Sequence, residues 1–211
     1  MICLIKLYMD RNKNPSGPPV WTGGFLCHGI LGNTANIRER RMRMFETGAY
    51  IVCGQHGVCR VESIGPIRLS EASEGKDYYT LAPLYSKGGV IYVPADSQKI
   101  IMRYVISRKE AETIIGEIDQ MDMIMIDNER QREETLKKAL KTCDTRQWIR
   151  VIKTINTRKK KRLAQGKKVT AGDERCLHAA QENLFGELAV SLGIAKSEVE
   201  SYIQKKTEKC E

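Results

Sequence analysis

The sequence predicts an α+β protein in which a small antiparallel β-barrel of about five strands precedes an all-α helical bundle. Two patterns indicate this: short runs rich in β-branched and aromatic residues fill 45–106, and helix-type spacing of apolar residues begins after 127. The chain has 211 residues, enough for two domains. Its 35 Lys and Arg against 26 Asp and Glu give a net charge of +9, which favours a polyanionic partner.

Residues 1–44 carry no periodic pattern. The stretch 12–24 contains three prolines and three glycines, and neither a strand nor a helix can run through such a composition. We therefore expect 1–44 to be a disordered or non-native arm. Because patterned sequence starts abruptly at Phe45, we also hypothesise that natural translation begins at Met42 or Met44.

The strand pattern opens with a hairpin. Apolar runs at 49–53 and 58–64 flank Gly54-Gln55-His56-Gly57, and glycines that bracket a polar pair between such runs predict a tight turn. Further short strand-like runs follow at 77–84, 89–93 and 100–105. We expect 45–106 to close into a small barrel or a strongly twisted sheet, since closure removes exposed edges.

The helical pattern begins at Ser107. Ser107-Arg108-Lys109-Glu110 fits a capping box, which predicts a short helix to about residue 118. We interpret the rest of 107–126 as a junction, with the methionines of 121–126 packed between the two domains. The segment 127–211 is then a separate helical domain.

Four helices are expected in this domain. They cover 129–141, a stretch capped by Asp144 that runs through 162, a stretch capped by Thr170 that runs through 192, and 197–206. In the second helix Trp148 belongs to an apolar stripe with Val151, Ile152 and Ile155, so we interpret it as a core residue. Such stripes bury one another in a compact bundle.

Positive charge is concentrated in the helical domain. Residues 130–168 hold fifteen Lys or Arg and three acidic residues, and 158–162 are five consecutive cations. A solvated helix face normally mixes signs, so this excess indicates a phosphate-binding surface. The sequence has no zinc-finger spacing, RNA-stacking signature or basic zipper, which favours contacts with the backbone of duplex DNA.

Cys53, His56 and Cys59 have a spacing that resembles a metal site. Zinc prefers four ligands, and no fourth is near in sequence, so core cysteines and a turn histidine are the preferred interpretation. A metal or redox module remains a third hypothesis. Hydrolase, kinase and metalloprotease motifs are absent from the sequence, so we predict neither an enzyme nor a cofactor.

Compartment follows from composition. No apolar run reaches the roughly twenty residues that span a bilayer. Seven cysteines, an odd number without regular spacing, favour reduced thiols over a disulfide framework. We therefore expect a cytoplasmic protein.

Several short motifs resemble those of one family. In order they are Phe45-Glu46-Thr47-Gly48, Gln55-His56-Gly57-Val58, Tyr78-Tyr79-Thr80-Leu81 and Val93-Pro94-Ala95-Asp96. This order is similar to the CarD/CdnL family of bacterial transcription regulators and to the polymerase-interacting domain of the transcription-repair coupling factor. The likeness continues through 166–188 and covers about 45–194.

The resemblance implies a Tudor/SH3-like barrel that docks by one edge on the β subunit of bacterial RNA polymerase. It also implies a helical domain that contacts double-stranded promoter DNA at the upstream fork and stabilises the open complex, in a monomeric, nucleoid-associated protein. Residue matching places polymerase binding at Ile67, Arg68, Ile91, Tyr92, Val93 and Pro94. Tyr92 stands where some members have arginine, and a tyrosine suits a protein interface.

One departure concerns DNA. Some members carry a tryptophan wedge where this chain has Ile126-Asp127-Asn128. We therefore expect contacts mainly with phosphates, through Arg150, Lys153, Arg158, Lys159, Lys160, Arg162, Lys167 and Lys168. The alternative is a nucleoid-type protein that binds DNA without sequence preference and without polymerase.

Overall fold

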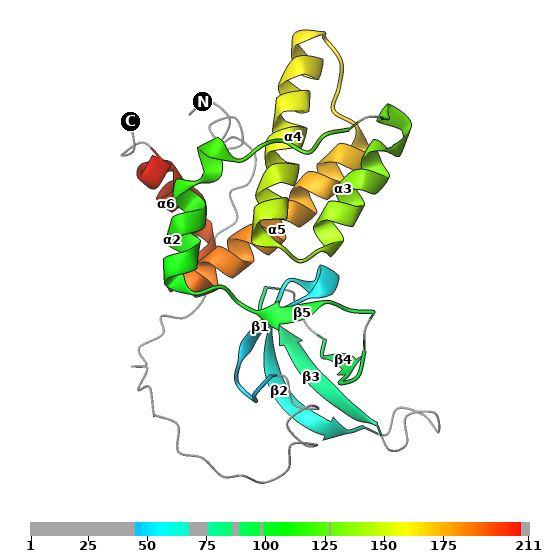
Figure 1. The fold of residues 1–211 in the computed structure, drawn as a ribbon, viewed down its shortest axis with the longest axis vertical. Helices are drawn as coiled ribbons and strands as arrows, with labels where there is room; N and C mark the ends of the chain where they lie inside the picture. The colour runs from blue at the N-terminus through cyan, green and yellow to red at the C-terminus, as the bar shows by residue number, and fades with distance from the viewer. Residues whose placement is uncertain (1–44, 68–75, 86–88, 98, 127, 208–211) are drawn as a thin grey trace.

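A computed structural model describes residues 45–67, 76–85, 89–97, 99–126 and 128–207 (Figure 1). The expectations for the arm 1–44 and for the translation start lie outside these residues. Within them, five strands precede the helices, so the predicted α+β class is confirmed. We call residues 45–106 the sheet unit and residues 107–207 the helical unit.

The strands form one antiparallel sheet in the order β4-β3-β2-β1-β5. They are β1 (Tyr50–Cys53), β2 (Val58–Pro66), β3 (Asp77–Pro83), β4 (Ile91–Pro94) and β5 (Met102–Tyr104). The two glycine-flanked runs do form a hairpin, in which the Cys53 amide donates to the Gly57 carbonyl at 2.9 Å. A short 3₁₀ turn, Gly54–His56, connects the two strands, and Gly57 has φ 69°.

The expected barrel closure is wrong. β4 and β5 lie at opposite edges, and within the described residues they do not pair with each other. Both are short, and the helical unit takes over the β5 side, where Arg103 binds Glu187 on a helix. An edge covered in this way needs no partner strand. In the part of the chain that the structure describes, β4 pairs only with β3, so the sheet is open at that edge.

One face of the sheet carries its own core. Phe45, Ile51, Cys53, Cys59, Val61, Tyr79, Leu81 and Val93 are buried there. The alternation of a β-strand places these side chains on one side and leaves their neighbours, such as Arg60 and Glu62, exposed. Cys53 and Cys59 are thus core residues, as predicted.

The helices begin and end close to their sequence signals. They are α2 (Arg108–Gly116), α3 (Arg132–Lys141), α4 (Thr145–Ala164), α5 (Ala171–Leu192) and α6 (Val199–Thr207), with 3₁₀ turns at Ile118–Gln120, Glu129–Gln131 and Lys196–Glu198. Ser107 and Glu110 form the predicted capping box. Asp144 and Thr170 cap α4 and α5, because each side chain accepts a first-turn amide.

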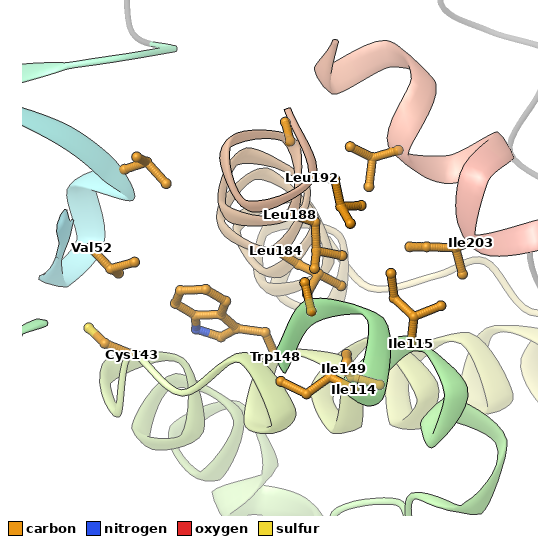
Figure 2. Packing of buried hydrophobic residues seen from close by; sticks show 14 residues of the cluster. Val52, Ile114, Ile115, Cys143, Trp148, Ile149, Leu184, Leu188, Leu192 and Ile203 are labelled. Atoms are coloured by element: carbon orange, nitrogen blue, oxygen red, sulfur yellow. The ribbon is translucent and has the colours of Figure 1, made fainter. Parts of the chain in front are cut away.

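A second core joins the two units (Figure 2). Val52 and Val58 of the sheet pack in one cluster with Trp148 of α4 and Leu184 and Leu188 of α5. Trp148 is fully buried and its indole Nε1 donates to the Leu140 carbonyl at 3.2 Å, which confirms it as a core residue. The sheet therefore rests directly on the helices through apolar contact.

Candidate polymerase-binding and DNA-binding surfaces

The residues predicted to bind polymerase fall largely on β4. Ile91, Tyr92, Val93 and Pro94 make up this whole strand, and β4 is an edge of the sheet. Tyr92 points outward and is 44% exposed, whereas Val93 is fully buried in the sheet core. Val93 can therefore offer a partner only its backbone, while Tyr92 can offer an aromatic side chain.

Ile67 directly follows Pro66, the last residue of β2. Pro66 pairs with Asp77, and the next residue, Tyr78, pairs with Pro94. The ends of β2 and β4 therefore lie at the same end of the sheet, with β3 between the two strands. Arg68 lies outside the described residues.

Val90 is an exposed residue on this edge that was not predicted. It is 48% exposed and directly precedes β4, in which Tyr92 is 44% exposed. The sequence signal that could have identified it is its place in the apolar run 89–93. Together the two side chains give the edge an apolar surface.

Tyr85, beyond the end of β3, contacts the helical unit with its ring. The Lys196 ammonium lies 4.8 Å from its ring centroid, and a Cβ added at Gly186 would meet the ring at 3.1 Å. Burial raises the pKa of Tyr85 to about 12, with the charge of Tyr50 adding to the shift. Tyr85 therefore helps to seat the sheet on α5.

The predicted DNA-binding cations fall into three groups along α4 and the turn that follows it. In the half nearer the sheet, they hold the segment 117–126, which runs along the helix. Arg150 Nε donates to the Asp122 carbonyl at 3.1 Å. Lys153 Nζ donates to the carbonyls of Ile118, Asp119 and Met121 at 2.9, 3.1 and 2.6 Å. Both cations are thus occupied by backbone oxygens.

Two further contacts fasten the same segment. Arg146 forms an ion pair with Glu117, and the Ile124 amide donates to Thr154 Oγ1 at 2.9 Å. Ile124 packs toward the helices, whereas Met125 is 83% exposed. The prediction that the methionines of 121–126 pack between domains is therefore wrong for Met123 and Met125, because the extended segment turns alternate side chains to solvent.

Arg158 belongs to a partly buried charge cluster. Its guanidinium pairs with Glu129 and lies 3.4 Å from Asp173 Oδ2, while Arg132 pairs with the other oxygen, Asp173 Oδ1, at 3.0 Å. Partial burial opposes ionisation of Glu129, but hydrogen bonds and charge from the two arginines lower its pKa. The cluster joins the starts of α3 and α5 to α4.

The remaining predicted cations gather where α4 ends and turns toward α5, the part of the helix farthest from the sheet (Figure 1). We call residues 159–168 the tip. Its six cations have no carboxylate among them: Lys159, Lys160, Lys161, Arg162, Lys167 and Lys168. Lys161, which the prediction omitted, is exposed in the same charge run that identified its neighbours.

The tip has a defined backbone. Arg162 Nε donates to the Lys168 carbonyl at 2.9 Å, and Gly166 adopts φ 69° in the turn. Lys160, Lys167 and Lys168 are exposed, whereas Lys159 is half-buried. Lys167 Nζ also donates to Gln165 Oε1 at 3.3 Å. A fixed backbone with exposed ammonium groups is suited to bind a row of phosphates.

At 126–128, where some members of the resembled family carry a tryptophan, the structure shows the N-terminal cap of a 3₁₀ turn. The Asn128 side chain accepts the Arg130 amide at 2.9 Å and begins the 3₁₀ turn that leads into α3. Ile126 precedes it, and Asp127 lies outside the described residues. Neither Ile126 nor Asn128 supplies an aromatic side chain.

The cysteine and histidine motif does not assemble. Cys53 and Cys59 are buried in the sheet core, while His56 is exposed on the turn. Burial raises the pKa of Cys53 to about 11 and that of Cys59 to about 12, with neighbouring thiols adding to each shift. Across the described residues, no three His, Cys, Asp or Glu side chains are grouped to hold a metal ion.

A family model matches part of the chain. Residues 45–105 match the model of the CarD-like/TRCF RID domain. No curated protein matches the chain. Among the described helices, none combines the length and the hydropathy that crossing a membrane would need. Residues 45–105 are therefore similar to the CarD-like/TRCF RID domain, and this similarity supports an RNA polymerase-interacting, transcription-related protein.

Proposed function

We propose that this protein binds the β subunit of bacterial RNA polymerase through β4 and promoter DNA through the tip, and thereby stabilises the open complex. The observation that carries the proposal is the open β4 edge within the matched domain. An unpaired edge can accept a partner strand through main-chain hydrogen bonds. Tyr92 and Val90 add exposed apolar surface beside those groups.

DNA binding is assigned to the tip for a different reason. The tip holds six cations and no carboxylate within residues 159–168, and Lys160, Lys161, Lys167 and Lys168 are exposed there. Arg150, Lys153 and Arg158 instead bind groups of other segments. Lysine and arginine side chains at such a site would contact DNA phosphates, and these contacts depend little on base sequence. Docking on polymerase would bring the protein to the promoter, and the tip would add affinity for the DNA there.

Stabilisation of the open complex follows if the tip reaches DNA only in that state. A ligand shifts an equilibrium by its difference in affinity for the two states. In this proposal residues 45–106 dock, 107–126 connect, and 127–211 bind DNA, in a monomer associated with the nucleoid. We expect added protein to lengthen the lifetime of promoter open complexes, measured by competitor challenge.

Docking is tested by a substitution on β4 in the full chain. Tyr92→Asp places a charge on the apolar edge and should lower affinity for the isolated β subunit by about tenfold or more. The control is Ile101→Asp, which changes a similarly exposed residue beside the opposite edge. Equal losses in the two variants, or none in either, would reject β4 as the docking site.

The tip also suits a second candidate function, DNA binding without polymerase. The same charge that favours promoter contact would hold any duplex. A nucleoid-type protein would bind random duplex equally well with and without polymerase, and that affinity would fall steeply with salt. The proposed factor would instead bind promoter DNA much more tightly when polymerase is present.

A further inference from the structure

A partly buried ion pair joins the two units, since the Arg103 side chain is 27% exposed. Glu187 of α5 is fully buried, and both of its carboxylate oxygens accept hydrogen bonds from the guanidinium of Arg103 on β5. Thr145 Oγ1 donates to Glu187 Oε2 at 2.8 Å, and the Ile106 amide donates to Oε1 at 3.2 Å. The carboxylate is therefore satisfied from three segments of the chain.

The guanidinium of Arg103 also makes several hydrogen bonds within the protein. Arg103 Nε donates to the Cys143 carbonyl at 2.5 Å, and Nη2 donates to Thr145 Oγ1 at 3.1 Å. Its carbon Cζ lies 5.7 Å from the ring centroid of Trp148. Burial disfavours the charge, but the hydrogen bonds and charge of Glu187 outweigh it and raise the pKa of Arg103. We call these residues, Arg103, Ile106, Cys143, Thr145 and Glu187, the Arg103 network.

The network lies where the sheet meets the helices. It connects β5, the segment leading to α2, the turn before α4, and α5. The other contacts described across this boundary include Val52 and Val58 packed against Trp148 and Leu184. Apolar contact is non-directional, so it holds surfaces together without selecting one orientation. A bidentate guanidinium–carboxylate pair does select one, because both partners have fixed planar geometry.

We infer that the Arg103–Glu187 pair is a positioning device that sets the orientation of the sheet unit on the helical unit. Buried ion pairs often add little net stability compared with apolar residues of similar volume, and their best-attested role is to fix register. The pair therefore holds β4 and the tip at one fixed separation. If the proposed function is right, this lets one docking event place the tip on DNA.

The inference is tested by replacing the pair with apolar residues in the full chain. Arg103→Met with Glu187→Leu keeps the volume and the surrounding core. Residual dipolar couplings of backbone amides then report orientation. In the wild type a single alignment tensor should fit both units. In the double variant the protein should stay folded, but the sheet and helical units should require two different tensors.

The matched control is Arg146→Met with Glu117→Leu, which removes an ion pair within the helical unit. It should keep the single tensor. A single tensor in the Arg103/Glu187 variant, or loss of its fold, would overturn the inference. Glu187→Gln provides a second variant of nearly unchanged shape, and it too should lose the common tensor.

A second test measures binding and rests on the proposed function. The double variant should bind the isolated β subunit and isolated duplex DNA within about twofold of wild type. Its affinity for polymerase bound to promoter should fall by about tenfold, because a loosely held tip has a lower effective concentration at the DNA. Equal losses in all three affinities would indicate a merely structural pair and overturn positioning. If the wild type bound neither partner, the proposed function would fail while the couplings still tested the orientation.

Discussion

The half of α4 nearer the sheet and the tip carry similar cations but use them differently. In the half nearer the sheet, Arg150 and Lys153 bind backbone carbonyls of the segment 117–126. In the tip, Lys160, Lys167 and Lys168 are exposed. The difference shows that a basic helix is not uniformly a binding surface. Arg150 and Lys153 fasten a separate segment to the helix, whereas Lys160, Lys167 and Lys168 expose their charge to solvent.

The strongest test of this contrast is the charge cluster at its boundary. Asp173→Asn removes the buried carboxylate that faces Arg132 and Arg158. Breaking a buried pair from one side leaves uncompensated charge and should lower the free energy of unfolding by about 3–5 kcal/mol. Urea denaturation measures the loss. Glu174→Gln, at the exposed next residue, should change stability by less than about 0.5 kcal/mol.

The tip should show the opposite behaviour. Replacing Lys160, Lys161, Lys167 and Lys168 by Gln should weaken duplex binding by about a hundredfold and reduce the salt slope by about four, roughly one per lost phosphate contact. The free energy of unfolding should stay within about 0.5 kcal/mol of wild type. Fluorescence anisotropy of labelled duplex across a salt series measures the affinity and its salt slope.

A control of equal charge is available elsewhere on the helices. The exposed residues Lys109, Lys141, Lys205 and Lys206 can be changed to Gln together. If this set weakened binding as much as the tip set, net charge and not the tip would explain the affinity.

Substitution of Lys153 distinguishes a stabilising role from a DNA-binding role at a single residue. Lys153→Met removes a donor from three carbonyls and should cost about 2 kcal/mol of stability. Duplex affinity should change by less than about twofold, since the ammonium is not offered to DNA. Lys160→Met should give the reverse pattern. A large loss of DNA binding in the Lys153 variant would mean that the segment 117–126 moves away from α4 in the complex.

The smallest effect is expected at the exposed end of the same segment. Glu117→Gln breaks the ion pair with Arg146, in which both side chains are more than one-third exposed. Surface pairs contribute about 0–1 kcal/mol, so thermal unfolding should barely shift. A cost comparable to that of Lys153→Met would show that the ion pair, and not the carbonyl contacts, fastens the segment.

Much of the fold was predictable because its signals are local. The capping box at Ser107 and the caps at Asp144 and Thr170 each act within one turn, and the structure confirms them. The stripe containing Trp148 needed only helical spacing. The open edge of the sheet could not be predicted in this way, because the β5 side contacts the helical unit through Arg103 and Glu187, which are 84 positions apart.

The candidate sites were less accessible to sequence reasoning. The partners of Lys153 are backbone carbonyls, which are the same for every residue type and leave no motif. Exposure of Met125 depends on the path of an extended segment along α4. Glu187 did have a signal, a carboxylate between Leu184 and Leu188 on a buried helix face, which physically demands a cationic or hydrogen-bonding partner.

The packing of α6 on α2 has a consequence for synthesis. Val199 and Ile203 of α6 lie in the same cluster as Ile114 and Ile115 of α2, although about eighty residues of chain separate the two helices. During translation the strands leave the ribosome first and can pair early. The apolar face of α2 that packs on α6 then stays exposed until α6 has left the ribosome. We therefore expect the nascent helical unit to be the part of the chain most in need of chaperone protection.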